Sequence, residues 1–487
     1  MPNPESRQLQ EALDGRLPVL PRERIYKTYG SLLWTTAVLS TASWAYLIGS
    51  ALPAFGNTRL TIVGYVIGLL IGEVAVIFAI GIPCYRYGAD AVDVAKASLG
   101  SRGSAFLLIM VLGTCIASAY ILIAMTARGI ARLASTAATP PTPISETLVV
   151  VTALALLPLL WYLTKRGPAA MERLSKFFAS GLIALALLIL GLLVMKYGAS
   201  GLGRHGVPPE LVVTKDPLAQ ITYGVEFGFD NALTLMPFLG SLTRLVRHKR
   251  HLVGPTLIGS ALVSASVLST VAAFGGDAFA DADPTSWIIK LAGPVWGSAI
   301  VAFVLIGNVG TLVVLFYIAS VALQQARAVA ALRWEWVIAL TLLPGIPFAF
   351  YTEWLLTRVM TLIAYNGMIF IGLAAVQIAD FYFLRRQRLQ MAHLFARPHQ
   401  GLYWYWGGVN WVAMAVIAEA AGVYLALFDP VSYRTDGYFR YIGAGIPALI
   451  TACVTYYGVM RFLIARGAVP TPWTATSQRA ATLEVGL

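Results

Sequence analysis

Residues 220–244 read QITYGVEFGFDNALTLMPFLGSLTR, and this stretch decides the fold. It is apolar enough to lie in a membrane, but glycines and Pro237 interrupt it, and Glu226 and Asp230 place two carboxyls inside it. Helix breakers are tolerated at membrane depth where the freed backbone is buried in protein or lines a cavity. Intramembrane carboxyls mark ion or substrate pathways. The stretch therefore predicts a broken membrane helix beside a transport site.

Other interpretations of the same residues stay open. The glycines could serve close helix packing, and the acids could pair with a neighbouring helix. If the turn between Glu226 and Asp230 stays helical, the two share a face, and neighbouring carboxyls suit a proton carrier. They could instead form the counter-ion of a cationic substrate. Asp230 or Asn231 could also cap the second half-helix, whose N-terminus favours anionic groups.

The composition indicates a polytopic membrane protein. The chain has 487 residues, of which 58% are hydrophobic and only 12% are charged, and its net charge is +12. Soluble domains carry about 25% charged residues. The cations lie in short loops between apolar runs, which excludes a nucleic-acid-binding face. Three scattered cysteines offer no metal site and no disulfide framework.

A bilayer needs about 20 apolar residues for each helical crossing, and on that rule the chain holds about twelve spans. Basic residues at 244–250 and 385–388 follow spans six and ten, whereas 277–283 after span seven contains three aspartates and no Lys or Arg. This asymmetry places both termini in the cytoplasm. The expected spans are 31–55, 60–83, 104–134, 145–164, 174–198, 217–240, 254–276, 287–322, 335–351, 355–384, 408–428 and 440–464.

Span one also appears as a broken helix in the sequence. Its interior, 40–45, reads STASWA, with Gly49 and Pro53 beyond it. Spans one and six then occupy corresponding positions if the first five spans repeat as the next five with inverted topology. Two discontinuous helices in such positions frame a site near the middle of the membrane. The eighth and tenth spans are long, so we expect them to tilt or to extend beyond the bilayer.

Four motifs carry a resemblance to a known family. They are YGADAVDVAKASLGSRGS at 87–104, PFLGSLTR at 237–244, IADFYFLRR at 378–386 and YWGGVNWVA at 405–413. Together and in this order they resemble the nucleobase–cation symporter-1 family, the permeases for cytosine, purines, uracil, allantoin, hydantoins and thiamine. Two of them also have physical interpretations, because Asp380 would pair with the adjacent arginines and Asn410 would cap a span.

The resemblance implies an all-α, leucine-transporter-like fold of five plus five inverted spans with two extra C-terminal helices. The expected organisation is a cytoplasmic N-terminal tail, the transporter domain and a cytoplasmic C-terminal tail, with both tails disordered. Their limits are 1–30, 31–465 and 466–487, with repeat one at about 31–198, repeat two at about 217–384 and accessory helices at about 408–464.

The family's sodium site, as the resemblance implies, uses carbonyls of broken span one and two adjacent hydroxyls in span eight. Here Thr311 keeps one hydroxyl, but Gly310 loses the other, and two asparagine positions become Leu312 and Leu315. This departure puts sodium coupling in doubt. The expected coupling ion is H⁺ or Na⁺, with no other cofactor, and the cation-coupling residues are Thr41, Gly310, Thr311, Glu226 and Asp230.

The family also holds its substrate between aromatic rings of spans three and six, and flat rings stack favourably on bases. Here the span-three position falls near Ser118, with Tyr120 as the nearest aromatic residue, and span six offers Phe227 or Phe229. Ordinary helix packing is the alternative role for any of these rings. The predicted substrate-binding residues are Ser43, Trp44, Ser118, Tyr120, Phe227, Phe229, Asp230 and Asn231.

The sequence thus predicts a secondary active permease that imports a nucleobase or related nitrogen heterocycle by cation symport. The alternative is an amino-acid or amine permease on the same scaffold, with Asp230 binding an ammonium group. No enzymatic constellation is visible in the sequence. The expected partners are the small heterocycle, H⁺ or Na⁺ and the lipid bilayer of the cell membrane, with no nucleic acid and with a monomeric chain.

Overall fold

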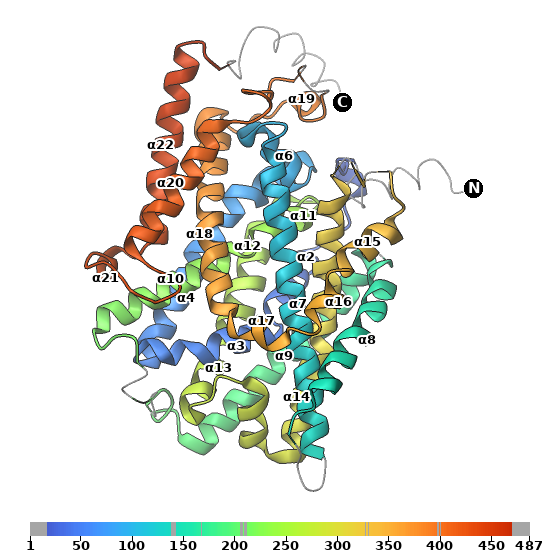
Figure 1. The fold of residues 1–487 in the computed structure, drawn as a ribbon, viewed down its shortest axis with the longest axis vertical. Coiled ribbons are helices and arrows are strands. Elements are labelled where there is room, and N and C mark those ends of the chain that lie inside the picture. Colours follow the sequence, from blue (N-terminus) through green and yellow to red (C-terminus); the bar gives the residue numbers. More distant parts are fainter. Residues whose placement is uncertain are drawn as a thin grey trace.

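The computed structural model is a bundle of helices joined by short loops (Figure 1). It describes residues 17–137, 143–166, 168–204, 208, 212–326, 328–329, 331–396, 399 and 401–469, without the side chains of 168–174. In this part of the chain, eight helices are long and apolar enough to cross a membrane, and a bent pair makes a ninth. Spans six, nine and eleven correspond to shorter helices, so each of the twelve expected spans has a helical counterpart.

The unbroken spans follow the predicted order. Span two is α4 Thr58–Val76, which continues through a π-helical turn into α5 Ile82–Tyr87. Span seven is α12 Val253–Thr256, the π-helix Leu257–Ala265 and α13 Ser266–Phe279. The other unbroken spans are α7 Ser104–Ala137, α8 Glu146–Thr164, α9 Pro168–Tyr197, α18 Val359–Ile378, α20 Trp411–Leu427 and α22 Gly445–Ala465. The short α6 Ala91–Leu99 lies between spans two and three.

Both predicted breaks are present. Span one consists of α2 Tyr29–Ser40 and α3 Ser43–Ala51, which the 3₁₀ turn Leu52–Phe55 extends, and its two halves are bent by 55°. Span six consists of α10 Pro217–Leu233 and α11 Met236–Thr243. Pro237 lies in the first turn of α11, where its missing N–H costs nothing, so it starts the second half-helix.

The glycines of span six do not break it. A Cβ at Gly228 would lie 2.0 Å from the Tyr65 carbonyl oxygen, and one at Gly68 would lie 1.9 Å from the Val225 carbonyl oxygen. These glycines let α10 and α4 approach backbone to backbone. The close-packing interpretation therefore holds for them, and the break itself lies at residues 234–235.

Spans eight to ten differ from the simple prediction. The eighth does not merely tilt: α14 Pro284–Gln324 contains a non-helical Gly293 with φ of +83°, so a short helix turns into the long one there. Span nine is divided into α15 Trp334–Leu342 and α16 Gly345–Phe348, and the separate α17 Thr352–Thr357 precedes α18.

The predicted N-terminal tail is too long. Val19 and Tyr26 are buried, and the Val19 N–H donates to the Gly88 carbonyl, while Tyr26 pairs with the chain that follows α11 through its N–H to the Leu245 carbonyl. The segment from residue 18 therefore belongs to the folded body. The rest of that tail, 1–16, and 470–487 of the C-terminal tail lie outside the described residues.

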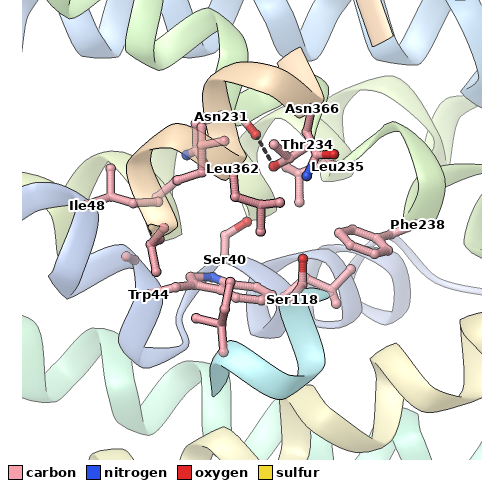
Figure 2. Close-up of a pocket in the computed structure, with 16 residues that line it drawn as sticks. Ser40, Trp44, Ile48, Ser118, Asn231, Thr234, Leu235, Phe238, Leu362 and Asn366 are labelled. Atoms are coloured by element: carbon pink, nitrogen blue, oxygen red, sulfur yellow. Dashed lines mark hydrogen bonds between the residues drawn. The ribbon is translucent and has the colours of Figure 1, made fainter. Parts of the chain in front are cut away.

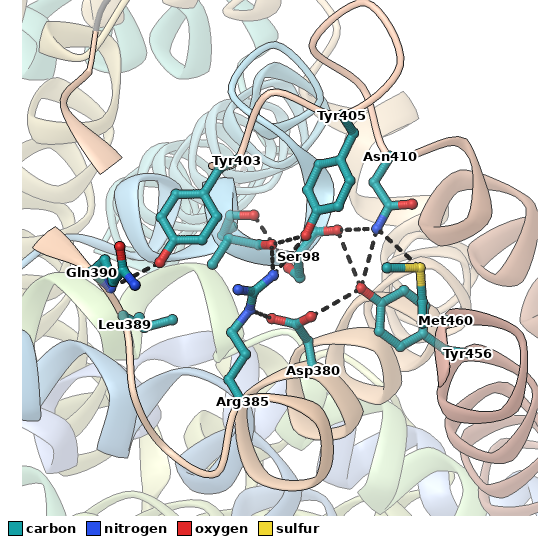
Figure 3. A network of polar contacts seen from close by, with 12 residues as sticks. Ser98, Asp380, Arg385, Leu389, Gln390, Tyr403, Tyr405, Asn410, Tyr456 and Met460 are labelled. Carbon is teal, nitrogen blue, oxygen red and sulfur yellow. Dashed lines mark hydrogen bonds and ion pairs between the residues drawn. The ribbon is translucent and has the colours of Figure 1, made fainter. Parts of the chain in front are cut away.

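Three of the four signature motifs meet in one buried polar network (Figure 3). Asp380 forms an ion pair with Arg385 and accepts a hydrogen bond from Tyr456 of α22 at 3.2 Å. Arg385 also donates to the Ala97 carbonyl of α6 at 2.8 Å. Asn410 caps α20 and donates to the Ser98 carbonyl at 2.7 Å. This network fixes the accessory helices α20 and α22 to the core and confirms the predicted pair and cap.

The fourth motif supplies a second buried cluster around Asp90. Its carboxylate accepts hydrogen bonds from Ser241 of α11 at 2.6 Å and from Gln325 at 2.8 Å, and Arg244 lies 4.0 Å away. The cluster ties the end of broken span six to the segment before α6. The motif residues thus hold the structure together at one end of the bundle.

Candidate functional site

A cavity lies between the two broken spans (Figure 2). Its volume is about 50 Å³, which is enough for a few waters. Spans one, three, six, seven and ten all contribute. The lining side chains are those of Leu39, Ser40, Trp44, Ala45, Ile48, Ser118, Ile121, Asn231, Thr234, Leu235, Phe238, Ala265, Val359, Leu362, Ile363 and Asn366.

Two amides supply the cavity's strongest polar groups. Asn231, at the end of α10, donates through Nδ2 to the Tyr65 hydroxyl at 2.8 Å. Asn366, in the middle of α18, accepts through Oδ1 from the Thr114 hydroxyl of α7 at 3.2 Å. These partners fix the orientation of both amides and leave the Asn231 oxygen and the Asn366 nitrogen for a ligand. The pair can therefore offer one acceptor and one donor to the edge of a flat polar molecule.

Aromatic rings and hydroxyls complete the wall. Trp44, in the first turn of α3, and Phe238, in α11, lie along one side of the cavity, with Ser40 and Ser118 near them (Figure 2). None of the sixteen lining residues is charged. Such a site suits an uncharged molecule with a flat face and a hydrogen-bonding edge.

The structure brings some predicted residues to this cavity. Trp44, Ser118 and Asn231 line it. Ser43, beside Trp44, turns toward α14, where its backbone N–H and its hydroxyl both donate to Asn308 Oδ1 at 3.0 Å. Ser43 therefore stands behind the cavity.

The other predicted aromatic residues lie elsewhere. Tyr120 donates to the Thr341 carbonyl at 2.7 Å and stacks on Phe348, so it packs span three against span nine. Phe227 sits 4.7 Å from Phe55 between ring centroids, in an aromatic cluster that also contains Phe428 and Tyr433. Phe229 is buried where Gly445 begins α22. For these three rings the packing role is the one that the structure favours. Tyr120 and Phe229 are each two residues from a lining residue, so helical periodicity turns them away from the cavity. Phe227 shares a face with Asn231 but lies one turn away from it along α10.

The two acids of α10 share a face, as predicted for an unbroken turn, but that face meets the accessory helices. Glu226 accepts hydrogen bonds from the N–H groups of Ala444 and Gly445, both at 2.8 Å. It therefore satisfies the N-terminus of α22. Neither Asp230 nor Asn231 caps α11, whose first turn has no side-chain cap, so that alternative is wrong.

Asp230 stands closer to the cavity. Its Oδ2 accepts a hydrogen bond from the Tyr424 hydroxyl of α20 at 2.6 Å, and its buried Oδ1 has no partner among the described residues. A Cβ at Gly367 would lie 2.3 Å from that oxygen. Asp230 of α10 thus lies against α18 and α20. The cavity is lined by Asn231, which follows Asp230 in the chain, and by Asn366, which precedes Gly367.

The residues predicted for cation coupling in spans one and eight lie next to each other. Thr311 and Thr41 both donate to the Val38 carbonyl, at 2.8 and 3.3 Å. At Gly310, a Cβ would meet the Phe178 ring at 2.8 Å. The resemblance leads one to expect a second hydroxyl at position 310, and the Phe178 ring fills the space where that side chain would lie.

A larger vestibule of about 430 Å³ opens beside the first turn of α3. Its charged residues form ion pairs across spans: Arg128 with Glu146 at 2.8 Å and with Glu353 at 3.6 Å, and Arg132 with Asp283 at 2.8 Å. Asp283 caps α14, and Glu353 lies in α17. The vestibule gives a route to Ser43 from the acidic-loop end of the bundle.

Sequence reasoning missed Ser40, Phe238 and Asn366. Asn366 could have been predicted from the sequence, since a lone amide in the apolar run of span ten needs a polar partner. Ser40 and Phe238 lay within the segments singled out as broken, but which of their residues face inward depends on the angle between the half-helices.

Comparisons with known proteins agree on one family and one fold. The family model described as "Permease for cytosine/purines, uracil, thiamine, allantoin" matches residues 18–439. A hydantoin permease of Microbacterium maritypicum is 34% identical over 84 residues, which cover 17% of this chain and only 16% of that protein.

Among solved structures, Mhp1, a nucleobase-cation-symport-1 family transporter in a closed conformation with bromovinylhydantoin bound, superposes with a TM-score of 0.75 at 16% identity, covering 95% of this chain and 98% of that one. A Na⁺-coupled sialic acid symporter gives a TM-score of 0.60 at 11% identity, covering 94% and 96%. These likenesses confirm the predicted leucine-transporter-like fold.

Proposed function

Because this chain belongs to the family of permeases for cytosine/purines, uracil, thiamine and allantoin, we propose that it is a secondary active transporter that imports an uncharged nucleobase-like heterocycle. Import proceeds by cation symport with alternating access. The chain is a multi-pass membrane protein of a transporter family, and the proposal adds the substrate class and the driving ion.

One observation carries the substrate class: the cavity between the broken spans is uncharged and combines two fixed amides with aromatic rings. A heterocycle can stack on the ring of Trp44 and place its N–H and C=O groups against Asn231 and Asn366. The bromovinylhydantoin bound by Mhp1 and the substrate named for the hydantoin permease are molecules of this kind. The amides come from spans six and ten, whereas the two span-eight positions where the resemblance leads one to expect asparagines are Leu312 and Leu315 here.

The rival substrate class, amines and amino acids, has less support. An ammonium group needs a carboxylate in the wall, and Asp230 faces α18 and α20 from behind it. The wall itself holds no charged residue. A neutral substrate avoids the cost of an unpaired charge in this cavity.

We favour H⁺ as the coupling ion, with Asp230 as its carrier. Asp230 has one oxygen without a partner in the described part of the chain. The next residue in α10, Asn231, lines the cavity, and so does Asn366 of α18, which precedes the Gly367 that Asp230 contacts. A proton arriving at that oxygen would change how α10 meets α18. Both oxygens of Glu226 accept hydrogen bonds from the N-terminus of α22, so we assign Glu226 a structural role instead.

The expected setting is the cell membrane, with both termini in the cytoplasm and the chain active as a monomer. The basic segments 244–250 and 385–388 would then face the cytoplasm, and the vestibule near Asp283 would face outward. Substrate would enter through the vestibule and reach the cavity past Ser43.

The test is uptake into proteoliposomes that contain the purified chain. Labelled cytosine, uracil, adenine, allantoin and hydantoin are offered separately, under an imposed H⁺ gradient, an imposed Na⁺ gradient or neither, with unlabelled amino acids as competitors. We expect at least one heterocycle to accumulate above its outside concentration under the H⁺ gradient and amino acids to compete poorly. Uptake of an amino acid without uptake of any heterocycle would overturn the proposal.

A further inference from the structure

The break in span one leaves backbone groups without intrahelical partners. The last carbonyls of α2 and the first N–H groups of α3 cannot bond within their own helices. The residue before α3, Ala42, has no side chain that could cap it, and no side-chain cap is present there. Buried groups of this kind need partners from elsewhere.

Asn308 of α14 serves the second half-helix. Its side chain is fully buried, and its Oδ1 accepts the Ser43 backbone N–H and the Ser43 hydroxyl, each at 3.0 Å. Its Nδ2 lies 2.9 Å from the Thr126 hydroxyl of α7 and 2.8 Å from the Ser43 hydroxyl oxygen. One amide thus caps α3 from outside and joins it to spans three and eight.

Thr311, one turn further along α14, serves the first half-helix. Its hydroxyl donates to the Val38 carbonyl at 2.8 Å, and the Thr41 hydroxyl donates to the same oxygen at 3.3 Å. Both lone pairs of that carbonyl are then engaged. Because a hard cation binds through such oxygen lone pairs, a cation here would have to displace these hydrogen bonds. The Phe178 ring occupies the space beside Gly310.

We propose that Asn308 and Thr311 form a neutral clasp that holds both halves of broken span one on α14 without a cation. Asn308 is the main positioning residue, because it sets the start of α3 and hence the place of Trp44 in the cavity wall. Only one part of this proposal rests on the proposed function, namely that Trp44 contacts the transported substrate. Its mechanical part can be tested without any substrate.

The experiment follows the outer half-helix with a cysteine at Leu47, which lines the vestibule. The partly buried native Cys453 is first replaced by Ser, and the two other native cysteines are buried. Maleimide labelling of Leu47→Cys is timed in full-length protein in liposomes, in Na⁺ and in choline buffer. Asn308→Ala is compared with Thr311→Val and with Ser320→Ala, a matched control on α14 whose hydroxyl contacts Thr341 instead of span one.

We expect the parent labelling rate to be the same within twofold in both buffers, because no cation takes part in the clasp. Asn308→Ala should raise the rate at least fivefold, Thr311→Val should raise it less, and Ser320→Ala should leave it unchanged. If Asn308→Ala does not elute as a folded species, Asn308→Asp and Ser43→Ala replace it, since each removes only part of the contact. Slower labelling of the parent in Na⁺, or an Asn308 variant within twofold of the parent, would overturn the clasp.

Failure of the transport proposal looks different. If no heterocycle accumulates in the uptake assay, the labelling rates still report on the clasp. If heterocycles accumulate but Na⁺ slows labelling of Leu47→Cys, the function stands and the clasp fails.

Discussion

Replacing Asp230 with Asn keeps the shape of the side chain but removes its ability to gain and lose a proton. The Tyr424 hydroxyl, 2.6 Å from Oδ2, can donate to the amide oxygen instead. A hydrogen bond to a charged group contributes about 1.5–3 kcal/mol and a neutral one about 0.5–1.5 kcal/mol, so the stability cost should be near 1 kcal/mol. We therefore expect Asp230→Asn to fold and to reach the membrane.

Its effect should fall on the coupling of transport to the H⁺ gradient. A one-to-one H⁺ symporter under a gradient of one pH unit has about 1.4 kcal/mol available, which corresponds to about tenfold accumulation of a neutral substrate. We expect Asp230→Asn to lower that accumulation ratio to about one. Exchange of labelled for unlabelled substrate at equal pH should continue, because the cavity wall is intact.

Glu226→Gln is the matched control. The N–H groups of Ala444 and Gly445 each donate to a different oxygen of Glu226 at 2.8 Å, so the NH₂ group of a glutamine would face one of these two donors and could not accept from it. Losing one such bond and leaving a buried N–H unpaired should cost about 1–3 kcal/mol of stability. We expect a lower unfolding temperature with accumulation retained. Full accumulation by Asp230→Asn, or its loss in a well-folded Glu226→Gln, would refute the division of roles.

Further substitutions test the cavity and the scaffold. Asn231→Leu and Asn366→Leu should each raise the substrate dissociation constant by about 5- to 150-fold, the equivalent of 1–3 kcal/mol for an unmade hydrogen bond, as measured by competition binding. Trp44→Ala should lose a similar 1–3 kcal/mol of stacking, whereas Trp44→Phe should keep most of it; equal affinities of the two variants would speak against stacking. Asp380→Ala should destabilise the protein by about 3–5 kcal/mol in thermal unfolding, since it leaves the buried Arg385 guanidinium without its carboxylate.

The sequence by itself predicted the membrane class, the order of the spans and the two broken helices. These features depend on local properties: twenty apolar residues in a row, a proline at 237 and small polar residues at 40–45. The pair between Asp380 and Arg385 and the cap at Asn410 are local in the same sense, because each joins residues within five positions of one another. Ordered motifs added the family, which the match over residues 18–439 confirms.

Which face of each helix meets the cavity was decided only by tertiary structure. Phe227, Phe229 and Asp230 sit near the break in the sequence, yet α10 packs closely on α4 through glycines of both helices. In that arrangement Phe229 and Asp230 meet the accessory helices, and Phe227 meets Phe55 and the aromatic residues just after α20. Asn366 lies 135 residues from Asn231, and nothing local indicates that the two amides share one wall. Rotation of a packed helix about its axis is set by contacts with all its neighbours together, and a single sequence does not contain that sum.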